Sequence, residues 1–157
     1  MVGSWGTVIQ FEVSSAKVLT PGSVEVQKSA RFAQQDTVGL APVYEFLGAG
    51  LSTCTLPVRL SIGQGVNPRA VIDALRTAMA TGRAEALVIG GNNVFGVKSL
   101  AVIDALSESW QSFTGQGGLQ VAEGTISFHE IVPRSLVPAA RPVASSTVSK
   151  TNVVKRK

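Results

Sequence analysis

The fold is decided by a stretch that opens with Leu51-Ser-Thr-Cys-Thr-Leu-Pro-Val-Arg-Leu-Ser-Ile62 and runs on to Asn92. Its first part alternates polar and apolar side chains. Thr53, Thr55 and Arg59 share one side of this period-two pattern, and we expect the apolar residues to mix faces around Pro57. The pattern predicts a strand with a bulge or a sheet edge at Pro57, because proline cannot donate a hydrogen bond to a central ladder.

A helix over residues 68–81 is predicted next. Asn67 is a favourable N-cap, and Pro68 occupies the first helical position, where a missing N–H costs nothing. Gly82 ends the pattern. The apolar stripe at helical spacing consists of Val71, Ile72, Ala74, Leu75, Ala78 and Met79.

A buried strand and a tight turn complete the stretch. Glu85-Ala-Leu-Val-Ile89 is a short apolar run typical of a buried strand. Gly90-Gly-Asn-Asn93 supplies residues that tolerate positive φ, so a hairpin turn is expected, followed by a returning strand over residues 95–107.

Strands are also predicted on both sides of this stretch. We expect them at residues 5–13, 23–35 and 119–132, the last after a turn at residues 115–118. The inventory is then six strands and one helix. The predicted fold class is mainly β with one helix (α+β).

The likeness to a known family rests on the order and spacing of these features. They are Gly6-Thr-Val-Ile-Gln-Phe11, Arg31-Phe32, Tyr44-Glu-Phe-Leu-Gly48, Thr55-Leu-Pro-Val-Arg-Leu60, Gly82, residues 87–90, Gly96 and residues 115–118. Over roughly residues 5 to 131 the chain resembles the GpU family of tail proteins from contractile-tailed bacteriophages. The resemblance implies a tail-tube-like β-sandwich or barrel with a flanking helix, in a virion structural protein assembled in the host bacterial cytoplasm.

The same resemblance implies a function in the phage tail. The expected role is a hexameric ring at the baseplate-proximal end of the tail tube, as a tube initiator or an adaptor to the hub. The alternative is a tail-completion or terminator ring at the head-proximal end. The implied partners are further copies of the chain, the tail tube protein, the baseplate hub and other tail proteins, with DNA passing through the lumen without specific binding.

The charge of the chain is unevenly distributed. The chain has 157 residues, of which 45% are apolar and only 15% charged, with a net charge of +4. Residues 132–157 carry six basic residues and no acidic one; the remainder has eight basic against ten acidic residues, a net charge of −2. Two parts are therefore predicted, a β domain over residues 1–131 and a basic C-terminal arm rich in Pro, Ser and Thr over residues 132–157. An acidic body argues against a nucleic-acid-binding core.

Two segments are predicted to make contacts. Residues 36–50 contain several glycines and a proline, so we expect an extended loop that presents Tyr44, Phe46 and Leu47 to a neighbouring subunit. In a monomer these side chains would instead fold back on the sheet. The C-terminal arm is expected either to order on a neighbouring protein or to be a frayed terminus. Its predicted contact residues are Leu136, Val143, Val148, Lys155, Arg156 and Lys157.

No catalytic, metal or cofactor site is predicted, and the chain is not expected to be an enzyme. Cys54 and His129 are the single cysteine and the single histidine, too few ligands for a zinc site. A Cys/His nucleophile pair would need an orienting acid as well. We expect neither a signal peptide nor a membrane span, because no basic segment is followed by an apolar run and no stretch reaches about 18 apolar residues. A monomeric binding module that uses the basic arm is the second functional class.

Overall fold

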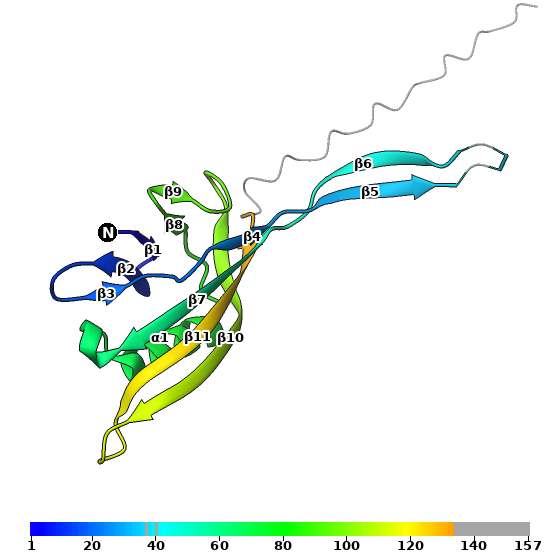
Figure 1. Cartoon of the computed structure of the whole chain (residues 1–157). Coiled ribbons are helices and arrows are strands. Elements are labelled where there is room, and N and C mark those ends of the chain that lie inside the picture. Colours follow the sequence, from blue (N-terminus) through cyan, green and yellow to red (C-terminus); the bar gives the residue numbers. More distant parts are fainter. Residues whose placement is uncertain (37, 40, 134–157) are drawn as a thin grey trace, which may run out of the picture.

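The largest unit is an antiparallel four-stranded sheet (Figure 1). The computed structural model describes residues 1–36, 38–39 and 41–133. In spatial order, the strands of the sheet are β10 (Leu100–Phe113), β11 (Leu119–Ile131), β7 (Thr53–Ser61) and β4 (Glu25–Gln27). With one α-helix among the described residues, the prediction of a mainly β fold with one helix is confirmed.

A second antiparallel sheet has five strands but is smaller, because its strands are short. It is built from the N-terminus and the residues after the helix. Its order is β3 (Val18–Leu19), β2 (Ile9–Val13), β1 (Gly3–Trp5), β8 (Leu87–Ile89) and β9 (Asn92–Asn93). The single strand expected over residues 5–13 is thus wrong, because the chain reverses between Trp5 and Ile9 and forms a hairpin. A bridge between Glu85 and Ala101 connects this sheet to β10.

Strand β7 alternates strictly between buried residues and residues that are partly or fully exposed. Its buried side chains are Cys54, Leu56, Val58 and Leu60. The expected mixing of faces is therefore wrong, because these apolar residues all lie on one face of the strand. Ile62 lies beyond the strand, in a short 3-10 helix, η1 (Ile62–Gln64). Pairing with β11 proceeds without a register shift, so Pro57 makes no bulge.

Pro57 lies instead beyond the end of the neighbouring strand. β4 pairs only with Thr53 to Thr55, and further along the Gly22 N–H donates to the Pro57 carbonyl at 2.8 Å. The missing N–H of Pro57 therefore breaks no ladder. The sheet-edge alternative is the one that the structure confirms.

Helix α1 (Pro68–Ala80) follows the predicted boundaries closely. The Asn67 side chain accepts a hydrogen bond from the Ala70 N–H at 3.3 Å, and Gly82, at φ 61°, follows the last turn. The helix buries Pro68, Ile72, Leu75 and Ala78 and packs on β10 and β11. Ala74 and Met79 are exposed, so the predicted apolar stripe was too wide.

The hydrophobic core lies between the four-stranded sheet and a second layer made of α1 and the small sheet. Trp5 joins these parts, because its indole N–H donates to the Ala101 carbonyl at 2.9 Å and its ring lies 5.4 Å from that of Phe128. Both rings are essentially inaccessible to solvent. The opposite face of the four-stranded sheet carries no second layer among the described residues, as Figure 1 shows.

Several sequence-based boundaries are corrected by the structure. Residues 23–35 form two strands, β4 and β5 (Ala30–Gln35), and residues 36–50 are not a loop, because β6 (Val43–Ala49) pairs with β5. The described residues contain eleven strands rather than six.

The strand expected over residues 95–107 begins later and ends later than predicted. Asn93 explains the late start, because its side chain donates to the Ser99 carbonyl and accepts from the Phe95 N–H, which holds residues 93–99 in a turn. The turn predicted at Gly90 and Gly91 is confirmed, with φ of 61° and 82°.

Trp5 offers a test of how the two layers depend on each other. Replacing Trp5 with Ala should lower the free energy of unfolding by about 3 to 5 kcal/mol, since the change leaves a large cavity between the layers. Trp110→Ala is the matched control, because Trp110 is 41% exposed and its replacement should lower the free energy of unfolding much less. Chemical denaturation of both variants measures the difference, and equal losses would contradict the assignment of Trp5 to the centre of the core.

Candidate functional site

Strands β5 and β6 form a two-stranded hairpin that projects from the body of the molecule (Figure 1). We call this hairpin, residues 30–49, the hairpin arm. Phe32 pairs with Phe46 and Gln34 pairs with Tyr44, so these four side chains share one face of the hairpin. The Phe32 and Phe46 rings meet edge to face at 5.5 Å, and the Tyr44 hydroxyl donates to the Gln34 side chain at 3.0 Å. This set, Phe32, Gln34, Tyr44 and Phe46, is the aromatic face of the arm.

The apolar side chains of the arm are exposed rather than folded back on the body. Phe32 is 56% exposed, Tyr44 67% and Phe46 62%. Leu47 is exposed as well, at a bulge where the register shifts and leaves it without a cross-strand partner. The structure thus presents all three sequence-predicted contact residues, Tyr44, Phe46 and Leu47, to solvent. It adds Phe32, which only the strand register could have revealed.

A buried carboxylate, Glu130, fixes the root of the arm. Its side chain accepts hydrogen bonds from the Ser52 N–H at 2.9 Å and from the Ser99 hydroxyl at 2.6 Å. Burial by itself would raise the pKa of Glu130, but the hydrogen bonds from Ser99 and Ser52 and the nearby Lys28 ammonium outweigh it, so the pKa lies below its ordinary value. Glu130 therefore stays ionised and holds the segment after β6 against β10 and β11.

A second exposed aromatic cluster lies near the turn between β10 and β11. Trp110 stands under two guanidinium groups, with Arg69 at 5.5 Å and Arg76 at 5.8 Å from its ring centroid. Phe113 lies 6.4 Å from Trp110. A groove of about 460 Å³ runs beside these rings and is also lined by Ile62 and Arg69. We call the surface formed by Ile62, Arg69, Trp110 and Phe113 the aromatic groove.

The uncovered face of the four-stranded sheet is mainly polar, and Glu25, the cross-strand partner of Thr55, lies on it. The register places Thr55, Pro57 and Arg59 of β7 beside Ser127, Thr125 and Glu123 of β11, and Ser107 and Ser109 of β10 beside Thr125 and Glu123. Arg59 lies 3.7 Å from Glu123, so its charge is partnered. This surface is the open face, and it contains a shallow groove of about 490 Å³.

The structure places Cys54 and His129 on opposite faces of the four-stranded sheet. Cys54 points into the core, where burial raises the pKa of its thiol to about 11, so it is protonated at neutral pH. His129 follows Phe128, the cross-strand partner of Cys54, and therefore lies on the opposite face. No group of three or more His, Cys, Asp or Glu side chains suited to a metal ion occurs in the part of the chain that the structure describes. None of the described helices is long and apolar enough to cross a membrane.

Comparison with known families identifies the family of the chain. A family model described as Phage P2 GpU matches residues 8–132, a range that holds the arm, the aromatic groove and the open face. The chain belongs to the Phage P2 GpU family. None of the curated proteins matches it.

Membership gives this GpU-family protein a structural role in the phage tail. It is a component of the virion tail and acts together with other tail proteins. The predicted C-terminal contact residues, Leu136, Val143, Val148, Lys155, Arg156 and Lys157, lie outside both the family match and the described residues.

Glu130 gives the GpU-family protein a defined pH dependence. The pKa of Glu130 is lowered in the folded state, so the stability it contributes is present above the ordinary glutamate pKa and is lost as the pH falls through the lower, folded value. Replacing Glu130 with Gln should reduce the free energy of unfolding by about 1 to 3 kcal/mol at neutral pH. The difference from the unsubstituted protein should shrink below about pH 4.

Chemical denaturation at a series of pH values measures this effect. Glu123→Gln serves as the control, because the Glu123 carboxylate is exposed and pairs with Arg59 at 3.7 Å and Gln111 at 2.7 Å on the surface, where such contacts contribute little. A pH-independent loss for Glu130→Gln would contradict the assigned role of the carboxylate.

Proposed function

We propose that this GpU-family protein forms a hexameric ring at the baseplate-proximal end of the tail tube, as a tube initiator or an adaptor to the hub. One observation carries the proposal. The four-stranded sheet is covered by α1 and the small sheet on one side and is open on the other, and the open face holds mostly serine and threonine, with Arg59 placed beside Glu123. In the ring, open faces of adjacent subunits line a shared channel and α1 lies on the outside.

The chemistry of the open face suits a channel through which DNA passes. Each phosphate that a protein neutralises adds a salt-dependent attraction, so a conducting wall has to avoid free Lys and Arg side chains. On the open face Arg59 is partnered by Glu123, and its neighbours Ser107, Ser109 and Thr125 are neutral. DNA would slide past such a wall without specific binding.

The hairpin arm supplies the contact between subunits in this proposal. Tyr44, Phe46 and Leu47, together with Phe32, expose apolar surface that would be buried on a neighbour. Aromatic side chains are over-represented among the residues that dominate the energy of protein interfaces.

The C-terminal arm, residues 132–157, enters the proposal on its sequence alone. Its apolar residues are interspersed with isolated basic residues, and only Lys155-Arg-Lys157 is densely charged. Such a segment suits contact with the next tail protein better than contact with DNA, since a short basic cluster gives only a weak and salt-sensitive attraction to phosphate.

A reconstruction of the assembled particle tests the position of the protein. The expected result is a ring of this chain between the tube and the baseplate, with β7 and β11 facing the lumen. A ring at the head-proximal end would overturn the position in favour of a terminator. Isolated copies on the exterior of the tail would overturn the ring itself.

Phe46 tests the contact role of the arm. Phe46→Ala should weaken each contact between subunits by about 1 to 3 kcal/mol, and the loss repeats around the ring, so incorporation into tails should fall while the thermal transition of the isolated protein stays unchanged. Val13→Ala is the control, because Val13 is similarly exposed but lies on the body. Incorporation is measured by quantifying the protein in purified tails. Lower thermal stability with normal incorporation would assign Phe46 to the subunit's own fold.

Serines of the open face test the channel wall. The double substitution Ser107→Lys and Ser109→Lys should leave ring assembly intact but slow the release of DNA from the tail, and added salt should relieve the defect. Ala80→Lys is the control, because it adds a cation at the exposed end of α1. Release is followed with a fluorescent DNA dye. Unchanged release with the doubly substituted protein in place would show that this face does not line the channel.

A further inference from the structure

We infer that the aromatic face of the arm binds in the aromatic groove of a second copy of this chain, so that subunits join head to tail. The inference rests on the proposed ring and names the surface that receives each arm. It also makes the contact directional, because every subunit gives one arm and accepts another.

The distribution of aromatic residues is the first argument. The chain contains six Phe, two Trp and one Tyr. Four of these nine are buried in the core: Trp5, Phe11, Phe95 and Phe128. The other five are exposed and fall into two clusters, Phe32, Tyr44 and Phe46 on the arm and Trp110 and Phe113 at the groove. Grouped aromatic residues that remain accessible mark surfaces that a partner covers.

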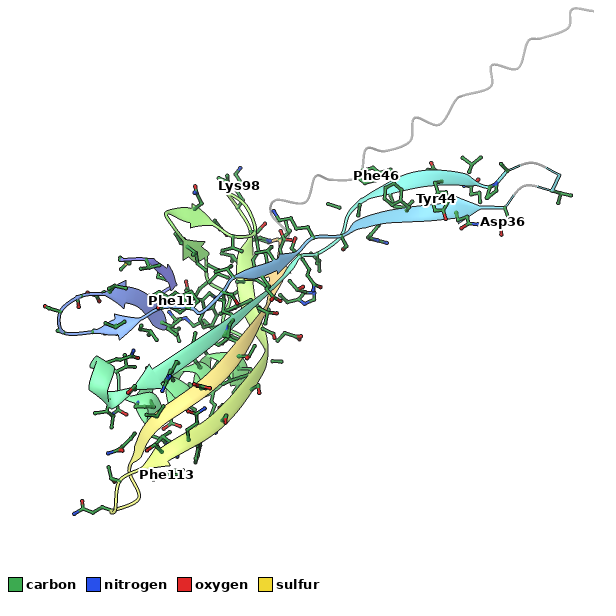
Figure 2. The ribbon with its side chains drawn as sticks, in the orientation of Figure 1. Phe11, Asp36, Tyr44, Phe46, Lys98 and Phe113 are labelled. Carbon is green, nitrogen blue, oxygen red and sulfur yellow. The ribbon has the colours of Figure 1, made fainter. Side chains whose placement is uncertain are left out.

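The placement of the two clusters is the second argument. Figure 2 shows Tyr44 and Phe46 near one end of the molecule and Phe113 at the opposite end. The arm therefore cannot reach the groove of its own subunit. Two different patches that complement each other make a heterologous contact, which closes into a ring when the rotation between subunits permits.

Charge complementarity is the third argument. On the arm, Asp36 accepts a hydrogen bond from the Gln34 side chain at 2.9 Å, and Gln34 in turn accepts from Tyr44, so a carboxylate lies beside the aromatic face. Among the described residues, Arg69 is the one charged residue that lines the groove, and its guanidinium also pairs with Asp73, outside the lining, at 3.2 Å. The arm as a whole has Arg31 against Asp36 and Glu45, a net charge of −1. Opposite charges beside each aromatic cluster fix the register of a contact.

The Trp110 side chain is held in one orientation in the groove before any partner binds. Trp110 is held by Arg69 and Arg76 beside it and by its N–H, which donates to Glu108 at 3.2 Å. Arg76 is itself fixed by two hydrogen bonds to Glu108, at 2.9 and 2.6 Å. A ring held in this way loses little rotational freedom on binding, and Phe46 or Tyr44 could pack edge to face against it.

Site-directed cross-linking in assembled tails tests the contact. Gln34→Cys marks the arm and Gln116→Cys marks the turn beside the groove, so the aromatic side chains of the contact are kept, while the native Cys54 is only 1% exposed and stays unreactive. The doubly substituted protein, treated with a short thiol-to-thiol cross-linker, should give a ladder of covalent oligomers. Tails assembled from a mixture of the two single variants should give covalent dimers and nothing larger, and each single variant alone should give monomers.

Two outcomes of the cross-linking would overturn the inference. Dimers from Gln34→Cys alone would indicate an arm-to-arm contact, and monomers from the doubly substituted protein inside intact tails would show that the arm binds elsewhere. The proposed function fails separately: a ladder obtained from tails in which the ring lies at the head-proximal end would support the head-to-tail contact and overturn the position.

Charge reversal provides a second test that does not depend on cysteine chemistry. Asp36→Arg and Arg69→Asp should each reduce incorporation into tails several-fold, and the combination should restore it, because the pair then has the opposite polarity. Glu45→Arg is the matched control, since Glu45 pairs with Ala33 on the other face of the arm. Thermal unfolding confirms that each variant is folded. The proposed contact would be overturned if the combined variant did not regain incorporation into tails, or if Glu45→Arg reduced incorporation as much as Asp36→Arg does.

Discussion

The register of β11 is the constraint on which the rest of the structure depends. This strand pairs with β10 along one edge and with β7 along the other, so the alternation of its side chains decides which face of the sheet is buried. Ala122, Ile126 and Phe128 face α1 and the small sheet, and Glu123 and Thr125 face outward. A slip by one residue would exchange the two sets. The hydrophobic core and the open face are therefore specified by the same hydrogen-bond ladder and cannot be altered independently.

The buried and the exposed aromatic residues lie in different regions of the molecule. The core aromatic residues, among them Trp5 and Phe128, lie between the layers of the body, whereas the aromatic rings of the arm and of the groove are exposed. Polar groups connect the two regions: Glu130 ties the chain after the arm to β10 and β11 through Ser52 and Ser99. Hydrogen bonds to a carboxylate are short and oriented, so Glu130 fixes the direction of the chain after the arm as well as stabilising its position.

Local signals made the central stretch predictable. The cap at Asn67, the glycine after α1 and the paired glycines at Gly90 and Gly91 act over a few residues, so their effect can be derived from the sequence alone. The arm was harder to predict, because the one proline and the glycines of residues 36–50 are typical of a loop and its strands are stabilised only by each other. Tyr44, Phe46 and Leu47 could be identified as exposed apolar residues, but Phe32 depends on the register. The groove depends on tertiary structure, since η1 and the end of β10 bring Ile62 and Phe113 together.

The pairing of the arm has a consequence for how order spreads through an assembly. β5 and β6 bond only to each other, so among the described residues each has one edge without a strand partner. A two-stranded hairpin of this kind is marginally stable in water and can open locally while the body stays folded. Binding to a neighbour adds its own free energy to the closed form. In the proposed head-to-tail contact, the amide protons of the arm should thus exchange rapidly with solvent in a free subunit and slowly in a bound one, and the rigidity of the hairpin would then be a property of the assembly rather than of the chain.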